Sequence, residues 1–553
     1  MATDDPSKPT KDNVPARRMR WWPIAAALAV GGALQFAATI FFGENRPYRD
    51  WACVFVIWPL TVFLLLLWWI FWSRLPWRTR GVGLLIIAVI AGSSLGAFRF
   101  DEFDGAMIPR FSPRWLPSKQ DQAAEFFKSN STNNASTTSD DLANESLVPT
   151  EGDWPAFRGP NRDDVVIGES LRTDWDASPP KQLWKHPIGS GWGAFAVIGR
   201  RAWTLEQRGE NELCVCYDIQ TGHELWTHAD AARFSSPQGG VGPCSTPTVH
   251  DGKVFTQGAT GILNCLDAAT GLRVWTRNTL EDASSPNLEW GQCGSPLIVD
   301  DLVIVNPGNN DEASRRNHSS VIAYRHETGE KAWAVQGRQG SYSSPHIATL
   351  RGEVLREFRS ESQVLIFDGL GIVALRPETG EPLWSFTWVN TPQVNSAQPL
   401  VIDENLVLIG SGYGKGSVLL GFLAAVDETG GRHLGVVERW QSAQFKLKFN
   451  SAVRRGEYVF GLDEGMLTCL SLMSGKRSWK QGRYGYGQLL LIEDKLLILS
   501  EEGDIVLVPA TPETPRELAR FHAIDGKTWN HPVLSRGRLL VRNSDEAACF
   551  DLR

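Results

Sequence analysis

The stretch NCLDAATGLRVW, residues 264–275, decides the fold that this sequence predicts. It is typical of a strand, a Thr-Gly turn and a second strand ending in tryptophan, because Gly271 supplies the positive φ that a tight hairpin needs. The pattern returns at intervals of about 40 to 60 residues, which indicates a repeat architecture. The corresponding turns of the other copies lie at residues 221–222, 328–329, 379–380, 429–430 and 474–475.

The intervals between copies predict the number of blades. Each holds about four short strand-like runs, as expected for a propeller blade. The aromatic residues that end the copies are Trp184, Trp226, Trp275, Trp333, Trp384, Trp440, Trp479 and Phe521. Residues 547–551 form the third strand of a last blade, and residues 182–186 a fourth strand with no blade before it. Pairing them removes an open sheet edge. The prediction is therefore an all-β, eight-bladed β-propeller of four-stranded antiparallel blades over residues 181–553, closed by strands from its two ends.

Three apolar runs precede the propeller, at residues 21–42, 51–72 and 81–98. Runs of about 20 residues are long enough to cross a bilayer as helices. The loop at residues 73–80 carries Arg74, Arg78 and Arg80 without an acid, so the positive-inside rule predicts a cytoplasmic tail at residues 1–20 and an outward-facing propeller. None of the runs contains an ionisable residue, which favours a plain anchor over an ion path.

Two segments connect the membrane helices to the propeller. Residues 99–150 are rich in Ser, Thr and Asn around residues 129–140. Such a composition buries little apolar surface, so we expect a flexible linker. Residues 151–180 contain Trp154 and Phe157 and are expected to pack on the propeller as a lead-in segment.

The net charge bears on the kind of partner, and the positions of the cysteines bear on whether they form disulfides. The net charge is −7 and no Lys/Arg run lies on a regular face, so we expect no nucleic-acid binding. Four of the eight cysteines stand where other copies of the repeat carry alanine, which predicts free, buried packing residues. These are Cys216, Cys265, Cys469 and Cys549. Cys244 and Cys293 occupy equivalent positions in adjacent blades and could approach each other.

The repeat, written Ala/Cys-x-Asp-x-x-Thr-Gly-x-x-x-Trp, resembles the pyrroloquinoline quinone (PQQ) repeat of quinoprotein alcohol dehydrogenase-like propellers. The entry WPAFRGPN, residues 154–161, is similar to that of membrane-anchored PQQ-repeat proteins abundant in planctomycete-type bacteria. The resemblance implies an eight-bladed propeller on the periplasmic side of the bacterial inner membrane. It does not imply bound PQQ, because the same repeat serves the non-enzymatic lipoprotein of outer-membrane barrel assembly.

The candidate site is the mouth of the central channel. In such a blade the start of the innermost strand and the end of the second strand lie on one face. The residues predicted at this face as ligand-binding are Trp192, Glu206, Arg208, Trp290, Gln292, Tyr342, Asn395, Lys446, Lys448, Asn450, Tyr484, Lys527, Trp529 and Asn530. The same positions also include Gln207, Tyr413, Asp463, Glu464, Tyr486 and Asn543.

Two interpretations of the mouth remain open. Aromatic rings beside lysines suit a planar anionic ligand, such as PQQ, or an acidic peptide or a sugar. Alternatively, the rings only plug the channel, with their polar ends in water. A dehydrogenase of this type would also need a calcium site and an Asp that acts as the general base. Such enzymes often have a pair of adjacent cysteines as well. The sequence has no such pair, and neither motif can be matched residue by residue, so no catalytic residue is assigned.

The function predicted from sequence is a membrane-tethered periplasmic propeller that binds a protein partner or an anionic small ligand without catalysis. A PQQ-dependent dehydrogenase that passes electrons to the membrane is the alternative. A sensor that signals through its three helices is a third option, which a flexible linker disfavours. No Cys/His cluster has the spacing of a zinc site, and no metal ligand is predicted.

Overall fold

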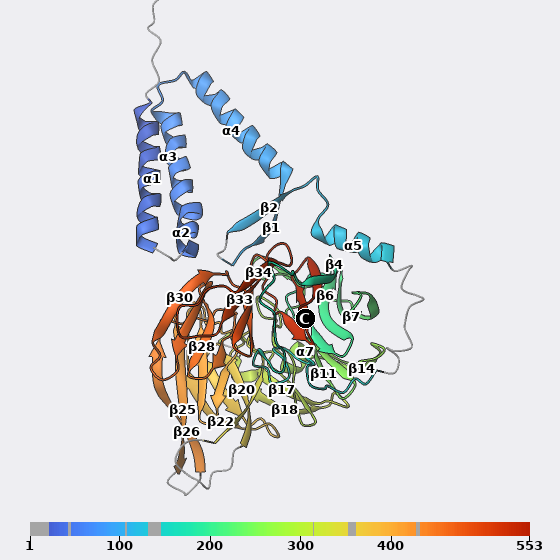
Figure 1. The fold of residues 1–553 in the computed structure, drawn as a ribbon. Coiled ribbons are helices and arrows are strands. Elements are labelled where there is room, and N and C mark those ends of the chain that lie inside the picture. Colours follow the sequence, from blue (N-terminus) through green and yellow to red (C-terminus); the bar gives the residue numbers. More distant parts are fainter. Residues whose placement is uncertain are drawn as a thin grey trace, which may run out of the picture. The chain divides into compact units, whose positions relative to one another are not determined.

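The computed structural model describes residues 21–42, 46–105, 108–130, 145–312, 315–351, 361–426 and 432–553. The chain divides into two units, Met1–Pro117 and Ser118–Arg553. The first contains apolar helices and a small hairpin, and the second contains the propeller (Figure 1).

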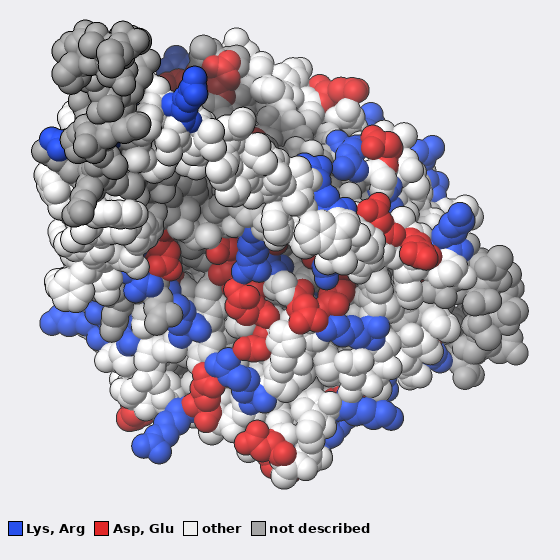
Figure 2. Space-filling view, turned by 90° about the horizontal axis from the view of Figure 1, so that it is seen from above, with Lys and Arg blue, Asp and Glu red and all other residues white. Residues whose placement is uncertain are grey.

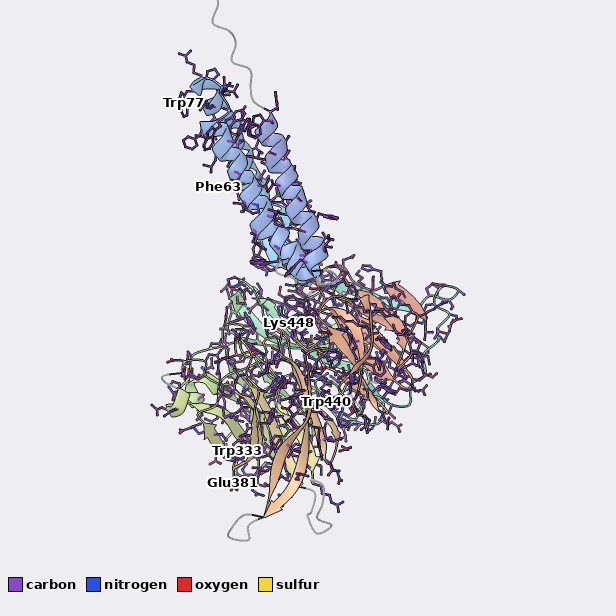
Figure 3. All side chains as sticks on the ribbon, turned by 90° about the vertical axis from the view of Figure 1, so that its left-hand side faces the viewer. Phe63, Trp77, Trp333, Glu381, Trp440 and Lys448 are labelled. Atoms are coloured by element: carbon purple, nitrogen blue, oxygen red, sulfur yellow. A yellow bond between two sulfur atoms is a disulfide. The ribbon has the colours of Figure 1, made fainter. Side chains whose placement is uncertain are left out.

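The first unit contains α1 (Trp22–Phe42), α2 (Arg46–Ala52), a π-helical turn (Cys53–Ile57), α3 (Trp58–Phe71) and α4 (Trp77–Ala97). Three helical stretches are long and apolar enough to cross a membrane: Trp22–Phe41, Arg49–Phe71 and Trp77–Ala97. Figure 3 labels Phe63 and Trp77, whose exposed aromatic side chains are of the kind that lipid would cover. Strands β1 (Phe98–Phe103) and β2 (Pro109–Pro113) form an antiparallel hairpin directly after α4.

The second unit confirms the predicted eight blades, each with four antiparallel strands. Seven take these strands in sequence order, and blade 8 takes its fourth from a strand that precedes blade 1 in the chain. Blade 1 consists of β5 (Ala196–Ile198), β6 (Arg201–Arg208), β7 (Asn211–Asp218) and β8 (Glu224–Asp230). Blade 2 consists of β11 (Thr248–His250), β12 (Lys253–Gln257), β13 (Ile262–Asp267) and β14 (Arg273–Asn278). Blade 3 consists of β15 (Leu297–Val299), β16 (Leu302–Val305), β17 (Ser319–Arg325) and β18 (Lys331–Gln336). Blade 4 consists of β19 (His346–Leu350), β20 (Glu361–Asp368), β21 (Gly371–Leu375) and β22 (Pro382–Thr387).

The remaining blades follow the same order. Blade 5 consists of β23 (Leu400–Asp403), β24 (Leu406–Ser411), β25 (Gly416–Val426) and β26 (Arg432–Ser442). Blade 6 consists of β27 (Val453–Arg455), β28 (Tyr458–Asp463), β29 (Met466–Ser471) and β30 (Arg477–Arg483). Blade 7 consists of β31 (Gln488–Ile492), β32 (Lys495–Leu499), β33 (Asp504–Pro509) and β34 (Ala519–His522). Blade 8 consists of β35 (Val533–Ser535), β36 (Arg538–Arg542), β37 (Glu546–Asp551) and β4 (Lys181–Pro187). Two short elements, β9 (Ser235–Ser236) with β10 (Gly240–Val241) and α7 (Thr279–Ala283), lie between blades.

The repeated glycine and tryptophan join one blade to the next. Gly271 has φ of 73°, and a Cβ there would lie 2.4 Å from the ring of Trp226 in the preceding blade. The indole Nε1 of Trp226 donates to the carbonyl of Ala268 at 3.1 Å, in the same turn. Trp275 makes the equivalent bond to His326. The repeat motif is therefore an inter-blade contact, with tryptophans such as Trp333 and Trp440 on the outer strands (Figure 3).

The structure confirms the predicted role of the four cysteines in the repeat. Cys265 lies directly opposite Trp275 across the β13–β14 pair, where a small side chain leaves room for the indole ring. Cys216, Cys265, Cys469 and Cys549 are all free and buried. Burial raises the pKa of the Cys216 thiol to about 12, so it stays protonated at neutral pH.

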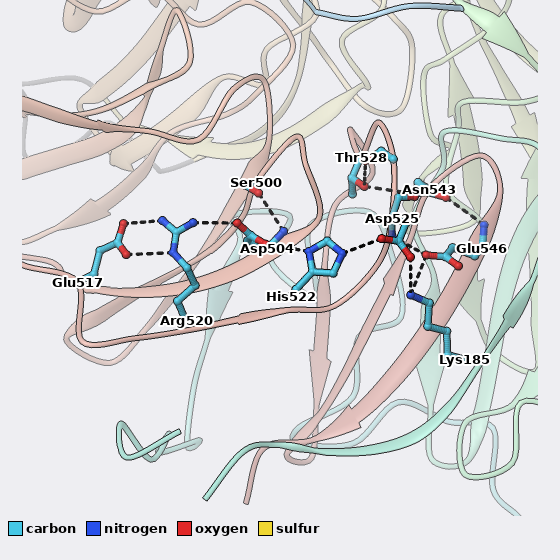
Figure 4. Close-up of polar contacts among 11 residues, drawn as sticks. Lys185, Ser500, Asp504, Glu517, Arg520, His522, Asp525, Thr528, Asn543 and Glu546 are labelled. Carbon is cyan, nitrogen blue, oxygen red and sulfur yellow. Dashed lines mark hydrogen bonds and ion pairs between the residues drawn. The ribbon is translucent and has the colours of Figure 1, made fainter. Parts of the chain in front are cut away.

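The predicted closure of the ring is also confirmed. Strand β37 pairs with β4 in antiparallel register, with Cys549 opposite Trp184. In Figure 1 the red C-terminal strand accordingly lies beside early strands of the propeller. A chain of charged contacts joins this pair to blade 7 (Figure 4). Lys185 on β4 lies 3.0 Å from Glu546 on β37 and 3.3 Å from Asp525, and the chain continues through His522, Asp504, Arg520 and Glu517.

His522 makes this contact chain sensitive to pH. Its hydrogen bonds to Asp504 (2.9 Å) and Asp525 (3.0 Å) raise its pKa above the ordinary value. Because the folded protein favours the protonated ring, protonation of His522 stabilises the fold. This stabilisation is complete below the unfolded pKa of about 6.5 and is lost as the pH rises through the folded pKa.

We therefore expect His522→Gln to lower the melting temperature at about pH 5.5 but to change it little at about pH 8.5. The effect should be small because His522 is half-exposed. Melting curves of the two proteins at both pH values measure it, and an equal loss at both would contradict the titration.

The lead-in segment crosses the centre of the propeller. Trp154 pairs with Val197 of blade 1, and the carbonyl of Pro155 accepts from the amide of Val249 in blade 2. Arg162 donates to the carbonyls of Ser295 and Pro296, just before blade 3. Other residues of the same segment contact the other side of the ring. Arg158 donates to Ala452 before blade 6, β3 (Val165–Val166) adds a parallel strand to β31 of blade 7, and Phe157 contacts His531 before blade 8.

The region expected to be a flexible linker contains two ordered parts. One is the β1–β2 hairpin, and the other is α5 (Lys119–Asn130). The start of α5 is capped by Ser118 and Asp121, which bond to each other's backbone amides. Its Phe126 ring stacks on His186 at 4.9 Å, so local capping and aromatic packing give order that composition did not indicate. Residues 131–144 of the expected linker lie outside the described residues.

Candidate functional site

The channel mouth brings together aromatic residues from the segments that precede the innermost strands and, in blade 5, from the turn after the second strand. We call this set the mouth ring; it consists of Trp192, Trp290, Tyr342, Tyr413, Phe449, Tyr486 and Trp529. All but Phe449 were singled out by the sequence pattern. The ring is continuous over its lysine-bearing half, where the centroids of Trp192 and Trp529 are 5.2 Å apart, those of Phe449 and Trp529 4.8 Å, and those of Phe449 and Tyr486 5.2 Å.

Two lysines lie on this half of the ring. The Nζ atom of Lys527 is 4.2 Å from the ring centre of Trp529 and 4.6 Å from that of Trp192. The Nζ atom of Lys448 is 4.7 Å from the ring centre of Tyr486, and 5.5 Å from those of Phe449 and Tyr413. Because Phe449 touches Trp529, the two ammonium groups share one bed of aromatic rings. Such cation–π contacts hold the two ammonium groups against the rings.

A buried carboxylate supports the bed from below. Glu501 accepts from the indole Nε1 of Trp529 at 2.9 Å and from the amide of Tyr486 at 3.0 Å. One side chain thus orients two members of the mouth ring. The ring is held by a specific polar contact as well as by packing.

The rest of the ring contains Trp290, Tyr342 and Tyr413, the last of which also faces Lys448. Trp290 and Tyr342 pack at 4.9 Å, and the amide of Trp290 donates to the Tyr342 hydroxyl at 3.3 Å. Burial, reinforced by the carboxylate of Glu289, raises the pKa of Tyr413 to about 12 and also raises that of Tyr342. Both phenols therefore remain protonated near neutral pH and keep a hydroxyl hydrogen to donate.

Two indole groups of the ring have unused donors. The Nε1 atoms of Trp192 and Trp290 are both buried, and within the described part of the chain neither has a hydrogen-bond acceptor. Buried polar groups without a partner are uncommon in folded proteins and call for a specific explanation. An acceptor on a bound ligand, or a water molecule, would satisfy them.

The predicted amides are placed beneath the mouth and position its loops. Asn395 donates to the carbonyl of Asp368, Asn450 to that of Leu462, and Asn530 to that of Gly193, each at 2.7 to 2.8 Å. Gln292 is also buried and donates to Asn287 at 3.1 Å. These side chains hold the backbone that carries the aromatic residues.

Lys446 and Tyr484 point to other partners. The Nζ atom of Lys446 lies 3.1 Å from Glu464 and 3.6 Å from Asp463. Tyr484 donates to Glu517 at 2.8 Å, which places its hydroxyl beside the outer part of blade 7. On the side of the molecule shown in Figure 2, the acidic and basic residues that the structure describes are interspersed and form no large patch of one charge.

Glu206 and Arg208 form a separate network beneath α5. The Glu206 carboxylate is fully buried, accepts from the Tyr217 hydroxyl at 2.6 Å and lies 2.7 Å from Arg208. The guanidinium of Arg208 covers the ring of Phe127 in α5 at 3.4 Å. A small pocket of about 60 Å³ lies between this arginine and α5.

The structure adds one aromatic residue to the site and joins the two cysteines that the sequence placed at equivalent positions in adjacent blades. Phe449 links the two lysine-bearing parts of the ring, although only its neighbours Lys448 and Asn450 were singled out. Cys244 and Cys293 form a disulfide, with their Cα atoms 4.7 Å apart. Their equivalent positions in adjacent blades were the only signal for this bond.

The touching ring pairs of the mouth leave no room for a planar group such as PQQ between their own two members. Stacked carbon atoms lie about 3.5 Å apart, so a planar group between two rings needs their centres about 7 Å apart. The ring pairs of the mouth lie at 4.8 to 5.2 Å and contact each other directly. Within the described ranges, no group of three or more His, Cys, Asp and Glu side chains is placed to hold a metal ion.

Comparison with known proteins identifies relatives of the propeller. A family model described as "Outer membrane protein assembly factor BamB" matches residues 173–312 and 209–481. No curated protein sequence matches the chain.

Solved structures resemble the chain at the level of fold. BamB from Moraxella catarrhalis is 17% identical, covers 68% of this chain and 98% of its own, and has a TM-score of 0.45. Quinohemoprotein alcohol dehydrogenase from Comamonas testosteroni is 14% identical, covers 78% and 84%, and has a TM-score of 0.48. Quinohemoprotein alcohol dehydrogenase ADHIIG from Pseudomonas putida HK5 is 14% identical, covers 73% and 80%, and has a TM-score of 0.46.

Proposed function

This chain belongs to the family described as outer membrane protein assembly factor BamB, and we propose that it is a membrane-anchored binding module of the bacterial periplasm. Its mouth ring binds an acidic segment of a partner protein. The observation that carries this proposal is the pair of lysines, Lys448 and Lys527, held over one bed of touching aromatic rings.

The chemistry of the bed favours an anion with apolar neighbours. Charge-assisted hydrogen bonds from ammonium groups are about twice as strong as neutral ones. Lys527 is only 3% exposed, so its charge is little screened by water. The indole donors of Trp192 and Trp290 add hydrogen bonds for carbonyl or carboxylate oxygens. An acidic segment that also carries aromatic residues would use both the charges and the rings.

Three features support the location. The helical stretches of the first unit are long and apolar enough to span a membrane. The loop between the second and third stretches carries arginines, which favours its cytoplasmic side and an outward-facing propeller. The Cys244–Cys293 disulfide favours an oxidising compartment, such as the periplasm.

The test uses an anionic probe on the full chain in detergent. We expect a fluorescent peptide of alternating Glu and Phe residues to bind, and Lys448→Ala to weaken its affinity at least about tenfold, because a charge-assisted contact contributes about 1.5 to 3 kcal/mol. The melting temperature should stay nearly unchanged. Lys476→Ala, which removes an exposed lysine from a turn of blade 6, is the matched control.

Two outcomes would contradict the proposal. Equal affinity of Lys448→Ala and the control would show that the lysine bed does not bind the anion. If the ring were only a plug, Trp529→Ala would cost about 3 to 5 kcal/mol of stability, as for a buried aromatic residue, without changing probe binding. Titration with PQQ in place of the peptide tests the dehydrogenase alternative.

A further inference from the structure

The disulfide connects a loop that contacts Trp192 of the mouth ring to the loop that carries Trp290. Cys244 follows Pro243, whose carbonyl accepts from the amide of Trp192 at 2.7 Å. The same loop approaches Trp192 closely at Gly240, where a Cβ would lie 3.0 Å from the indole ring. On the other side of the bond, Cys293 lies three residues after Trp290.

These two loops contain little regular secondary structure. The first contains only the two-residue strands β9 and β10, and the second has no strand between α7 and β15. Hydrogen bonds hold them, such as the one from the Thr246 amide to the Ser295 hydroxyl at 2.9 Å, which joins the two loops directly, and the one from the Trp290 amide to Tyr342 at 3.3 Å. The disulfide adds a covalent link between the same two loops. It joins residues 49 apart in sequence, so it also restricts the unfolded chain.

The two cysteines of the disulfide also differ from the other cysteines of the propeller in their exposure to solvent. Cys244 and Cys293 are partly exposed, whereas Cys214, Cys216, Cys265, Cys469 and Cys549 are buried thiols. Thiol–disulfide exchange requires that a thiolate reach a sulfur atom. Within the propeller, this pair is therefore the more accessible one to an external thiol.

We propose that the Cys244–Cys293 disulfide is a redox clasp of the mouth ring, which holds the ring in its binding form when oxidised and releases it when a dithiol reduces the bond. This inference rests on the proposed function, because it assigns a regulation to the same site. The thiolate of the dithiol attacks one cystine sulfur and breaks the S–S bond, leaving a mixed disulfide. The second thiol of the dithiol then displaces the protein sulfur. The protein gains two electrons and two protons as two thiols, and the dithiol leaves as its disulfide.

Reduction should disturb the ring at Trp192 and Trp290 and spare it at Lys448 and Tyr486. The two tryptophans contact the clasped loops or lie on them, whereas Lys448 and Tyr486 lie on segments before blades 6 and 7 that contain no cystine. A bound peptide that contacts both places would lose part of its contacts. The expected result is a weaker affinity with the propeller still folded.

The experiment uses the full chain in detergent, with and without dithiothreitol. Alkylation and mass spectrometry count the thiols released, and hydrogen–deuterium exchange follows residues 239–246 and 289–294, with residues 443–450 as the internal reference. We expect release of the two thiols of this pair, faster exchange in the first two segments only, and at least about fivefold weaker binding of the Glu/Phe peptide. Cys244→Ser/Cys293→Ser should reproduce the reduced state and no longer respond to dithiothreitol.

The outcomes separate this inference from the proposed function. Peptide binding that is unchanged by reduction, or a bond that dithiothreitol leaves intact in the folded protein, would overturn the clasp. If the peptide fails to bind the oxidised protein, the proposed function fails. The clasp is then judged by exchange alone: unchanged exchange in residues 239–246 and 289–294 after reduction would refute it. Because the reductant acts on the native chain, the test does not depend on whether the double variant folds.

Discussion

A chain that lacks residues 547–553 should fail to unfold cooperatively and should aggregate. The deletion removes β37 except for Glu546, and so leaves β36 and β4 with open edges in blade 8. It also removes the fully buried side chains of Ala547, Ala548 and Cys549 from the largest core cluster. Unpaired edges pair readily with other chains, and closing the ring is what eliminates them here. Melting curves and size-exclusion chromatography of the full chain and the truncated chain measure the effect.

The matched control ends at Leu552. It lacks only Arg553, which is exposed and pairs with Asp551 at the surface. This chain should melt within a few degrees of the full one, because exposed ion pairs contribute about 0 to 1 kcal/mol. If the chain without residues 547–553 melted as the control does, the closing strand would not stabilise the ring.

The fold was largely predictable because its repeat encodes both local and long-range geometry. The glycine sets the turn within a blade, and the tryptophan of the preceding blade packs on it, as Trp226 does on Gly271. A periodic sequence signal therefore fixes the contact between neighbours as well as the strands. The same logic explains why cysteine alternates with alanine opposite the tryptophan, as at Cys265 and Trp275.

The site was only partly predictable because its side chains lie on irregular segments. Lys446 and Lys448 are two residues apart and would point the same way on a strand. Residues 446–448 are not in a strand, and the two ammonium groups diverge, one to Glu464 and one over Tyr486. Phe449 faces the ring for the same reason. The disulfide depended on the distance between two loops, which no spacing in the sequence gives.

The largest effect of a single substitution is expected at Arg158, in the lead-in segment. Its guanidinium is 1% exposed, with Nε 2.5 Å from Asp164 Oδ2 and Nη2 3.3 Å from the carbonyl of Ala452. Burial acts to raise the pKa of Asp164, but Arg158 and His531 outweigh it and lower that pKa. Arg158→Met would leave a buried carboxylate without its main partner, which costs about 3 to 5 kcal/mol. Denaturant unfolding of the full chain in detergent measures the loss.

Two further variants separate the charge from the packing. Arg158→Met/Asp164→Leu removes both charges and should recover most of the stability, because apolar residues of similar volume replace a buried ion pair at little or no cost. Arg172→Ala breaks an exposed pair with Asp174 and should leave the free energy of unfolding nearly unchanged. A double variant as unstable as Arg158→Met would mean that the hydrogen bond to Ala452, and not the ion pair, holds blade 6 to the segment.

The pH dependence of stability gives a further test. Because the Asp164 pKa is lowered in the folded protein, the ionised carboxylate stabilises the fold above the unfolded pKa, and this stabilisation is lost as the pH falls. Arg158→Met should therefore also flatten the fall in stability below about pH 4. That pH dependence distinguishes an unpaired carboxylate from a cavity, whose cost does not titrate.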